Sequence, residues 1–249
     1  MIIRDILAPN PGPFTLDGTR TYLLGESAVL DPGPAIESHI EAIHNAMPRL
    51  KTIFITHRHA DHAPAAAPLK RVTGARIVAP AGVIDETDVI VRGGEKVEDL
   101  EVIATPGHTH EHVCFLTPDR DLFTGDTILG TGTTAIFPPD GNMSDYMQSL
   151  RTLRARNPKR IFPGHGPTRD DAAALIDEYI AHRLQREQEV IDALRNGAHT
   201  IPEMRRRIYA ALDPRLEKAA EVQIGAHLIK LQEEGRVDVR DGAYALNNR

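Results

Sequence analysis

The chain has 249 residues, a net charge of −6, and 41% hydrophobic against 26% charged residues. This length and composition are typical of a globular enzyme with a substantial core and room for a second, smaller domain. No apolar run approaches the roughly 18 to 20 residues that span a membrane, and residues 1–5 lack the long apolar segment of a signal peptide. We therefore expect no membrane partner and a cytoplasmic location.

In chain order, the first two-thirds of the sequence alternates strand-like and helix-like segments. We expect a hairpin at 20–24 and 28–31, a helix at 36–46, a strand at 52–56 and a helix at 61–72. Strands follow near 77–79, 101–105, 113–116 and 122–124, before a helix at 145–154 and a strand at 160–162. This order predicts an α/β fold with mixed sheets covered by helices.

The single cysteine of the chain, Cys114, cannot form an internal disulfide bond. It lies in the apolar run 113–116, which is typical of a core residue rather than of a nucleophile. We therefore expect Cys114 to contribute to packing only.

The most informative segment, residues 56–62, directly follows a predicted strand. It holds the imidazoles of His57, His59 and His62 and the carboxylate of Asp61. Because side chains alternate along an extended chain, His57 and His59 share one side, while Asp61 and His62 begin the next helix and face a second position. Such a cluster would be costly to order without a metal to coordinate it. One segment can therefore supply ligands to two adjacent cations.

Further ligands are expected elsewhere, because a pair of zinc ions needs about three protein groups each plus a bridging water or hydroxide. Three isolated residues fit this need: His108, Asp126 and His165 each follow a glycine in a turn after an apolar, strand-like run. Each turn can end a strand at a shared edge. The sequence thus predicts a metal site built from distant segments.

The pattern H-x-H-x-D-H, followed by a later His, Asp and His, resembles the metallo-β-lactamase superfamily over roughly residues 15–170. The resemblance implies two sheets packed face to face with helices outside, the αββα sandwich. It also implies the ligands of two Zn²⁺ ions per chain: His57, His59 and His108 for the first, Asp61, His62 and His165 for the second, and Asp126 as the bridge. Since Asp61 could also orient the attacking hydroxide, the predicted catalytic residues are Asp61 and Asp126.

Other polar residues near these motifs have alternative interpretations. We expect His112 to begin the strand 113–116 and His110 to cap or line the pocket, without binding metal. Asp31 resembles the early Asp-Pro-Gly turn of the superfamily and could orient a metal-bound histidine, or it could be an ordinary turn carboxylate. Arg58 could steer an anionic substrate or face solvent as a spacer. Arg20 stands where the resemblance leads us to expect Asn.

The remaining histidines stand alone in the sequence. An isolated histidine is usually exposed, or buried with its polar atoms satisfied. We therefore expect no metal role for five residues: His39, His44, His182, His199 and His227.

After His165 the pattern becomes helical. Segments 170–194, 201–212 and 216–234 are helix-like, and alternation on either side of Asp241 and Gly242 predicts a hairpin within 236–246. Three helices and a two-stranded wing predict a winged helix. We therefore divide the chain into a catalytic domain, residues 1–182, and a winged-helix domain, residues 183–249.

The charge of the predicted winged helix argues against groove binding. Residues 183–249 carry 12 Lys and Arg against 11 Asp and Glu, and only 205–207 form a basic run. A domain that binds the phosphates of a duplex should show a basic excess. We therefore expect no duplex DNA partner, and we expect the module to pack over the metal site and shape substrate access.

The two domains together resemble the subgroup called lactamase-beta-like protein two, and segments 123–130, 145–150, 162–167 and 182–188 agree with it. The resemblance implies a metal-dependent hydrolase whose bridging hydroxide attacks a carbonyl carbon or a phosphorus. We expect a small acyl substrate: an ester, thioester, lactam or similar compound. One alternative is a single-strand-specific endoribonuclease acting on single-stranded RNA. Another is a regulator that binds nucleic acid through the winged helix. The oligomeric state is not indicated.

Overall fold

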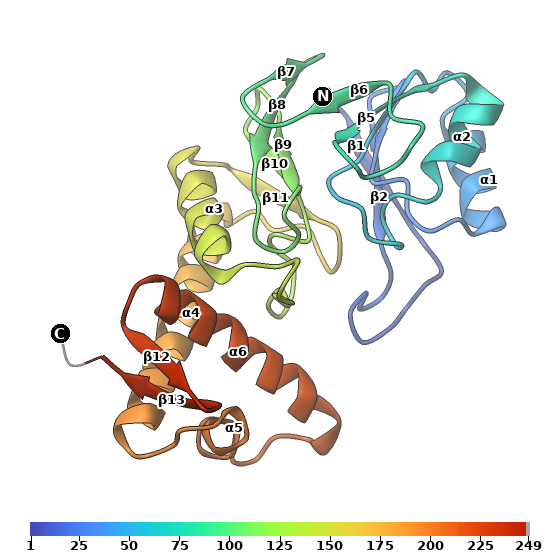
Figure 1. Ribbon diagram of the computed structural model, residues 1–249. Coiled ribbons are helices and arrows are strands. Elements are labelled where there is room, and N and C mark those ends of the chain that lie inside the picture. Colours follow the sequence, from blue (N-terminus) through green and yellow to red (C-terminus); the bar gives the residue numbers. More distant parts are fainter. Residues whose placement is uncertain (248–249) are drawn as a thin grey trace.

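The computed structural model describes residues 1–247 and contains two stacked sheets with a smaller helical unit attached (Figure 1). The first sheet has six strands in chain order: β1 (Ile3–Leu7), β2 (Arg20–Leu24), β3 (Ala28–Leu30), β4 (Thr52–Phe54), β5 (Arg76–Pro80) and β6 (Val89–Val91). The pairs β1 with β2 and β2 with β3 are antiparallel, and β3 to β6 are parallel. The sheet is therefore mixed, as predicted.

The second sheet has five strands in the order β11-β10-β9-β8-β7. Their bounds are β7 (Lys96–Val97), β8 (Leu100–Ala104), β9 (Val113–Leu116), β10 (Asp121–Gly125) and β11 (Arg160–Pro163). Only β10 and β11 run parallel. Their parallel pairing places the carboxyl ends of two strands side by side, and the segments carrying Asp126 and His165 both start there.

Aromatic side chains fill the space between the sheets. The Tyr22 ring lies 5.2 Å from that of Phe123 and 5.5 Å from that of Phe162, and the Phe54 and Phe115 rings lie 5.3 Å apart, all edge-on. These rings are among the buried residues of one apolar cluster that joins both sheets. Burial of such large apolar side chains supplies much of the stability of the sandwich.

Helices cover the outer faces of both sheets, which confirms the predicted αββα sandwich (Figure 1). The helices on the first sheet are α1 (Glu37–Ala46) and α2 (Ala66–Thr73), and those on the second are α3 (Met143–Ala155) and the first part of α4 (Ala172–Arg195). Each pair buries an apolar cluster of its own against its sheet. The core thus has three layers.

The helix predicted at 61–72 begins later than expected. α2 starts at Ala66, and residues 60–65 form turns, so Asp61 and His62 lie on a loop rather than on a helix. Two prolines explain the difference. A helix starting at 61 would place Pro64 and Pro68 where their missing N–H groups and rings disrupt it, whereas a start at 66 keeps Pro68 in the first turn.

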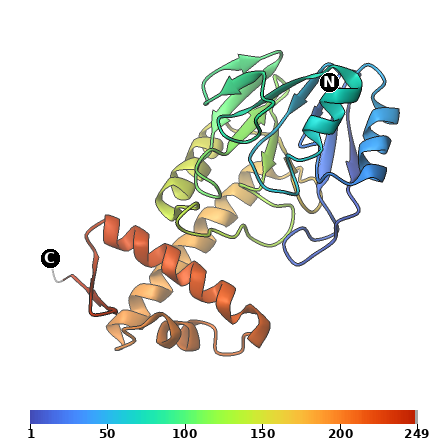
Figure 2. The ribbon, with the colours of Figure 1, turned by 45° about the vertical axis from the view of Figure 1, so that its right-hand side comes forward.

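The C-terminal unit is a winged helix, as predicted. It combines the end of α4 with α5 (Ile201–Ile208), α6 (Glu217–Glu233) and the hairpin β12 (Val237–Arg240) and β13 (Ala243–Leu246). The two turn residues Asp241 and Gly242 both have positive φ, 52° and 78°, as a tight hairpin requires. Figure 2 shows α4 running from the sandwich into this unit as one helix. The predicted division at 182/183 falls inside α4 and stays a prediction.

Three strands were not predicted: β1, β6 and β7. Each lies at an edge of its sheet and is partly exposed, so its sequence has no continuous apolar run. Among residues 1–247, no helix is both long and apolar enough to cross a membrane. The cytoplasmic location stays a prediction.

Candidate metal centre

The structure brings together all seven residues that the sequence singled out as ligands. They form two groups, and within each group one ligand atom per residue lies within 4.8 Å of the others. The first group is His57, His59, His108 and Asp126, and the second is Asp61, His62 and His165. All of them lie on loops that leave the carboxyl ends of β4, β8, β10 and β11. Their role as ligands stays a prediction, which this convergence supports.

The distances within the groups are short enough for shared coordination. His108 Nε2 lies 3.0 Å from His59 Nδ1, and His62 Nε2 lies 3.3 Å from His165 Nε2. Asp61 Oδ2 lies 3.1 Å from His165 Nε2. Side chains that meet in this way bring several nitrogen and oxygen lone pairs together, as a cation requires.

Asp126 lies between the two groups. Its Oδ2 is 3.6 Å from His108 Nε2, while its Oδ1 is 3.3 Å from His62 Nε2 and 3.4 Å from His165 Nε2. One carboxylate oxygen therefore faces each group, which is the arrangement that a bridging ligand needs.

Two buried polar atoms of the cluster have no hydrogen-bond partner within residues 1–247: His57 Nε2 and Asp126 Oδ1. His57 is fully buried. A buried polar atom without a partner is costly, and a coordinated cation would satisfy both of these. The donor set of imidazoles and carboxylates therefore fits a pair of divalent metals.

The ring nitrogens that point away from the cluster are anchored by outer partners. His62 Nδ1 lies 3.0 Å from Asp31 Oδ2, His165 Nδ1 lies 3.1 Å from Gly18 O, and His108 Nδ1 lies 2.9 Å from Ala135 O. Such partners fix ring orientation and raise ligand basicity.

Asp31 therefore orients His62, and it is not an ordinary turn carboxylate. The same carboxylate accepts hydrogen bonds from the Thr56 backbone N–H at 2.8 Å and from the Thr56 hydroxyl at 2.9 Å. Asp31 is 1% exposed, so these bonds are shielded from water. They tie the end of β3 to the start of the ligand loop.

Two glycines let the ligand loops approach one another. A Cβ on Gly164 would lie 2.6 Å from His62 Cε1 and 2.7 Å from Asp126 Oδ1. A Cβ on Gly125, whose φ is 48°, would lie 2.5 Å from Thr56 Oγ1. Only glycine fits these positions, which explains why Asp126 and His165 each follow one.

Comparison with known proteins agrees with this geometry. The family model described as metallo-beta-lactamase superfamily matches residues 15–87 and 75–165, and the beta-lactamase associated winged helix domain matches residues 200–244. A beta-lactamase-like protein 2 homolog from Caenorhabditis elegans is 36% identical over 94% of this chain and 85% of its own length. The chain belongs to the metallo-beta-lactamase superfamily. The predicted enzyme class, a hydrolase of this superfamily, agrees with that membership.

Two further comparisons cover other levels of similarity. A protein of Aspergillus novofumigatus named atrochrysone carboxyl ACP thioesterase is 33% identical over 78% of this chain and 63% of its own length. A crystal structure of a beta-lactamase domain protein from Burkholderia ambifaria has a TM-score of 0.82 at 21% identity and covers 98% of this chain and 91% of its own. The latter shows that a solved structure shares the fold of nearly the whole chain.

Burial and charge set the protonation of the cluster. Burial, with a smaller effect of His62, lowers the pKa of His57 well below its usual range. Burial disfavours the ionised form of Asp126, but His62 and His165 outweigh it and hold the pKa of Asp126 well below its usual range. Burial also opposes the charged form of His165, but the Asp126 carboxylate 3.4 Å away outweighs burial and raises the pKa of His165 to about 9. A cation that binds here would replace a proton on His165.

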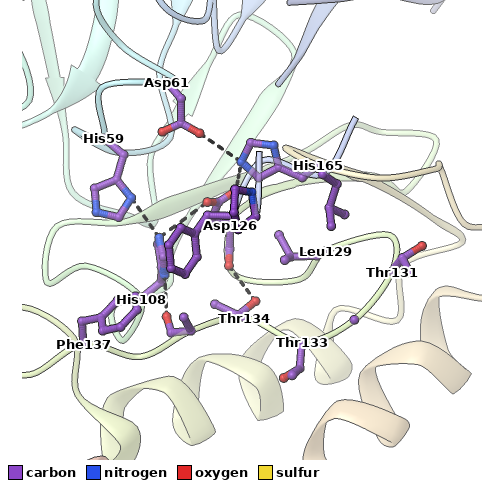
Figure 3. A pocket seen from close by; sticks show the side chains of 15 residues that line it. His59, Asp61, His108, Asp126, Leu129, Thr131, Thr133, Thr134, Phe137 and His165 are labelled. Atoms are coloured by element: carbon purple, nitrogen blue, oxygen red, sulfur yellow. Dashed lines mark hydrogen bonds and ion pairs between the residues drawn. The ribbon is translucent and has the colours of Figure 1, made fainter. Parts of the chain in front are cut away.

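A pocket of about 510 Å³ opens over the cluster (Figure 3). His59, Asp61, His108, Asp126 and His165 line one part of it. The rest of the wall comes from two loops that the sequence analysis did not single out, 13–16 and 129–137. Their signal in the sequence is weak: exposed aromatic residues, Phe14 and Phe137, in segments rich in Pro and Gly.

The structure decides between several interpretations of neighbouring residues. His112 is buried, directly precedes β9, and stacks on the His57 ring at 4.9 Å, while its Nε2 accepts from the Asp126 backbone N–H at 3.3 Å. The prediction that His110 lines the pocket is wrong. His110 is exposed, and its Nδ1 lies 2.8 Å from Asp140 Oδ1.

The two arginines near the motifs are occupied by acidic partners. The Arg58 guanidinium pairs with Glu111 at 3.0 Å and with Asp140 at 2.6 Å and does not line the pocket, so the idea that it steers an anionic substrate finds no support. Arg20 donates to Gly166 O at 2.6 Å and pairs with Asp5 and Asp17. It thereby joins β2 to the loop that follows His165.

A third group of ligand-type side chains, His110, Glu111 and Asp140, also lies close together. Arg58 pairs with both of its carboxylates, so a cation of the protein already balances their charge. We therefore do not extend the predicted metal site to this third group.

Proposed function

We propose that this superfamily hydrolase uses two zinc ions to hydrolyse a small acyl compound, with a thioester as the favoured class and esters and lactams as alternatives. The observation that carries the proposal is the wall of the pocket over the cluster. Among the described residues no Lys or Arg lines it, and its wall includes Pro13, Phe14, Leu16, Leu129 and Phe137. An apolar acyl chain fits this wall, whereas a polyanionic strand would find no cation beyond the metals.

Two aromatic rings flank the pocket. Phe14 and Phe137 come from separate loops and meet edge-on, with their ring centres 6.1 Å apart. Phe14 is 65% exposed, so its ring could shield an apolar substrate from water once one is bound. The thioesterase named among the relatives supports a thioester in this position.

The roles of the seven residues follow from their positions. We assign one zinc ion to His57, His59 and His108, the other to Asp61, His62 and His165, and the bridge to Asp126. Two bound zinc ions would supply the nucleophile, since they lower the pKa of a shared water towards about 7 and polarise an acyl oxygen.

Asp61 has a second role in this proposal. Burial disfavours its ionised form, but the hydrogen bond from His165 outweighs burial and lowers the pKa of Asp61. The carboxylate is therefore ionised at neutral pH. Its Oδ2 lies 3.4 Å from the Thr19 hydroxyl, which holds it towards the pocket, where it can accept a proton or orient a water.

The winged helix contributes no residue to this pocket within residues 1–247. It reaches the pocket wall indirectly, because the Gln223 amide donates to Ile136 O at 2.9 Å. We keep the division into a catalytic domain, residues 1–182, and a winged-helix domain, residues 183–249, as a proposal in which the second domain supports the wall.

The test is turnover by the purified, zinc-loaded protein of four substrates side by side: an acyl thioester, a lactone, a β-lactam and unstructured single-stranded RNA. We expect thioester cleavage that falls to background in His59→Ala and is unchanged in His44→Ala, which alters an exposed histidine. Cleavage of the RNA alone, sensitive to His59→Ala, would replace the acyl proposal by the ribonuclease alternative. The acyl proposal would be rejected if no acyl compound were turned over faster by the unaltered protein than by the His59→Ala variant.

A further inference from the structure

A second cavity, of about 420 Å³, lies where α4 and α6 cross and where segment 133–135 comes against them. We call it the junction pocket and define it by residues 133–135, 182–186 and 209–227. It adjoins the pocket over the metal cluster, because Thr133, Thr134 and Ala135 line both. No residue of the proposed metal site lines it.

The junction pocket contains a buried guanidinium without an acidic partner. Arg183 is 2% exposed, and within residues 1–247 no carboxylate lies within 4.0 Å of its nitrogens. Its guanidinium donates to Thr133 Oγ1 at 2.6 Å and to Thr134 O, while Nε has no partner. Buried charges in proteins are usually paired, because an unpaired one loses its hydration without compensation.

Two histidines lie beside this guanidinium and also lack partners. His227 on α6 is 2% exposed, and neither of its ring nitrogens makes a hydrogen bond within residues 1–247. His182 on α4 has an unpartnered Nδ1. We had expected isolated histidines to be exposed or satisfied, and for His227 that expectation is wrong.

The surroundings of these residues are positive. Burial, followed by the charges of Arg183 and Lys230, lowers the pKa of His227 to about 3. Lys230 is itself paired with Glu187 at 2.6 Å, and Arg186 is paired with Glu189 at 2.7 Å. Among the described residues, Arg183 is therefore the cation of the pocket that has no counter-charge.

The rest of the lining of the junction pocket is largely apolar. It is formed by Leu212, Leu216, Ala219 and Ala220 before and within α6, and Tyr209 lies under the Arg186 guanidinium at 4.7 Å. A ligand that fills the cavity would thus meet cationic and imidazole groups together with aliphatic side chains.

We propose that the junction pocket binds an anionic group, a phosphate monoester or a carboxylate, carried on an apolar body. The oxyanion would accept hydrogen bonds from Arg183 Nε and from the ring N–H groups of His182 and His227 and would neutralise the guanidinium. The apolar body would pack on the aliphatic side of the cavity.

This pocket is coupled to the metal cluster by a short chain of hydrogen bonds. Arg183 donates to Thr134 O, and the Thr134 hydroxyl donates to Asp126 O at 2.9 Å. Figure 3 shows Thr134 beside Asp126, with Thr133 farther along the same segment. The anionic group could therefore belong to the substrate itself or to a separate effector, and both sources share the same chemistry.

The test is calorimetric binding of hexyl phosphate, hexanoate and 1-hexanol to the full-length, zinc-loaded protein. We expect the two anions to bind and the alcohol not to bind. Arg183→Gln and His227→Leu should each weaken hexyl phosphate at least about tenfold, because the first removes the positive charge and the second removes a ring N–H donor to the oxyanion. Arg195→Gln, which alters an exposed arginine on the same helix, should leave affinity unchanged. Equal affinity in all four proteins, or no binding of either anion, would overturn the proposal.

A second measurement separates the junction pocket from the metals. Asp61→Ala disables the metal cluster but leaves the junction pocket intact, so hexyl phosphate should still bind; loss of binding in this variant would place the anion on the metals and overturn the proposal. His182→Leu changes a half-buried position and removes a ring N–H donor, so it provides a second test if Arg183→Gln does not fold. Because the readout is heat of binding, it does not depend on the proposed acyl hydrolysis.

The source of the anionic group follows from kinetics on whichever substrate is turned over. Hexyl phosphate should raise only KM if the junction pocket holds an acidic group of the substrate, and should change kcat if it holds a separate effector. Either effect should disappear in His227→Leu. An effect that persists undiminished in this variant would mean that hexyl phosphate acts elsewhere and would overturn the proposal.

Discussion

Two groups of histidines lie around adjoining pockets of this protein, and their surroundings have opposite charge. In the metal cluster, His62 and His165 face the carboxylates of Asp61 and Asp126, and their outer nitrogens are anchored. In the junction pocket, His227 faces a guanidinium and has no partner within residues 1–247. Acidic side chains distinguish the first group from the second.

The difference shows how the same residue type serves opposite ligands. Carboxylates raise the pKa of His62 and His165 against the effect of burial, so these rings carry protons that a cation would replace. Burial, followed by positive neighbours, lowers the pKa of His227 and leaves its ring neutral. A cation would satisfy the first group and an anion the second, so neither burial nor residue type alone identifies the ligand.

The largest expected effect comes from removing the acid that joins the two metal-binding groups. Asp126→Asn should lower hydrolytic activity by more than about 100-fold. Changing a residue that only contacts a metal ligand costs up to about 100-fold, and Asp126 is proposed to be a direct ligand of both ions. Metal content by mass spectrometry should fall below two ions per chain. Asp145→Asn, at an exposed position, is the control. Full activity with two bound ions in Asp126→Asn would contradict the proposal that Asp126 bridges the two metals.

A smaller effect should follow from changing the acid behind His62. Asp31→Asn keeps the size of the side chain but removes the charge that faces His62 Nδ1, and the metal affinity should fall about 10- to 100-fold. Competition with a chelator measures this loss. The exposed Asp85→Asn serves as the control. An unchanged affinity in Asp31→Asn would mean that the outer acid only holds the loop through Thr56.

Much of the fold could be predicted from the sequence, and the exceptions have physical reasons. The buried strands β4, β9, β10 and β11 have continuous apolar runs, and their predicted positions are confirmed to within two residues. The edge strand β1 was missed because one side of it has no neighbour to bury its side chains. The predicted start of α2 at residue 61 was wrong, because that prediction followed the helical pattern of the segment and neglected Pro64 and Pro68.

The metal cluster and the junction pocket also differ in how far the sequence could predict them. The metal cluster could be predicted because four of its residues are concentrated in segment 57–62 and the rest follow glycine turns. The outer partners Gly18 O and Ala135 O could not, since a backbone carbonyl has no sequence signature. The junction pocket could not either, because His182 and His227 meet only through the packing of α6 on α4.

The contrast between the two sites also predicts how stability depends on pH. Since the pKa of His227 is about 3 in the folded protein and about 6.5 in an unfolded chain, the unfolded state binds the proton more strongly between these values. Stability is therefore lost as the pH falls below about 6.5. From pH 7 to pH 5 this histidine should cost about 2 kcal/mol of unfolding free energy.

His227→Gln removes this titration, so its urea midpoint should fall less between pH 7 and pH 5 than that of the unaltered protein. The exposed His44→Gln controls for loss of a histidine elsewhere. Saturating hexyl phosphate should reduce the difference, because an anion beside His227 favours the protonated ring. If the urea midpoint depended on pH identically with and without His227, the proposed difference in histidine protonation between the two sites would be wrong.

The smallest expected effect is on duplex DNA, and it tests whether the positive character of the junction pocket extends over the winged helix. Of the basic run 205–207, Arg205 is already paired with Glu217 at 2.7 Å and with Glu221 at 3.2 Å, both on α6. These carboxylates would repel phosphates in a groove. We therefore expect no measurable binding to a 20-base-pair duplex in low salt, and no change in Glu217→Gln. Binding that weakens steeply with added salt would show that the positive charge is not confined to the cavity.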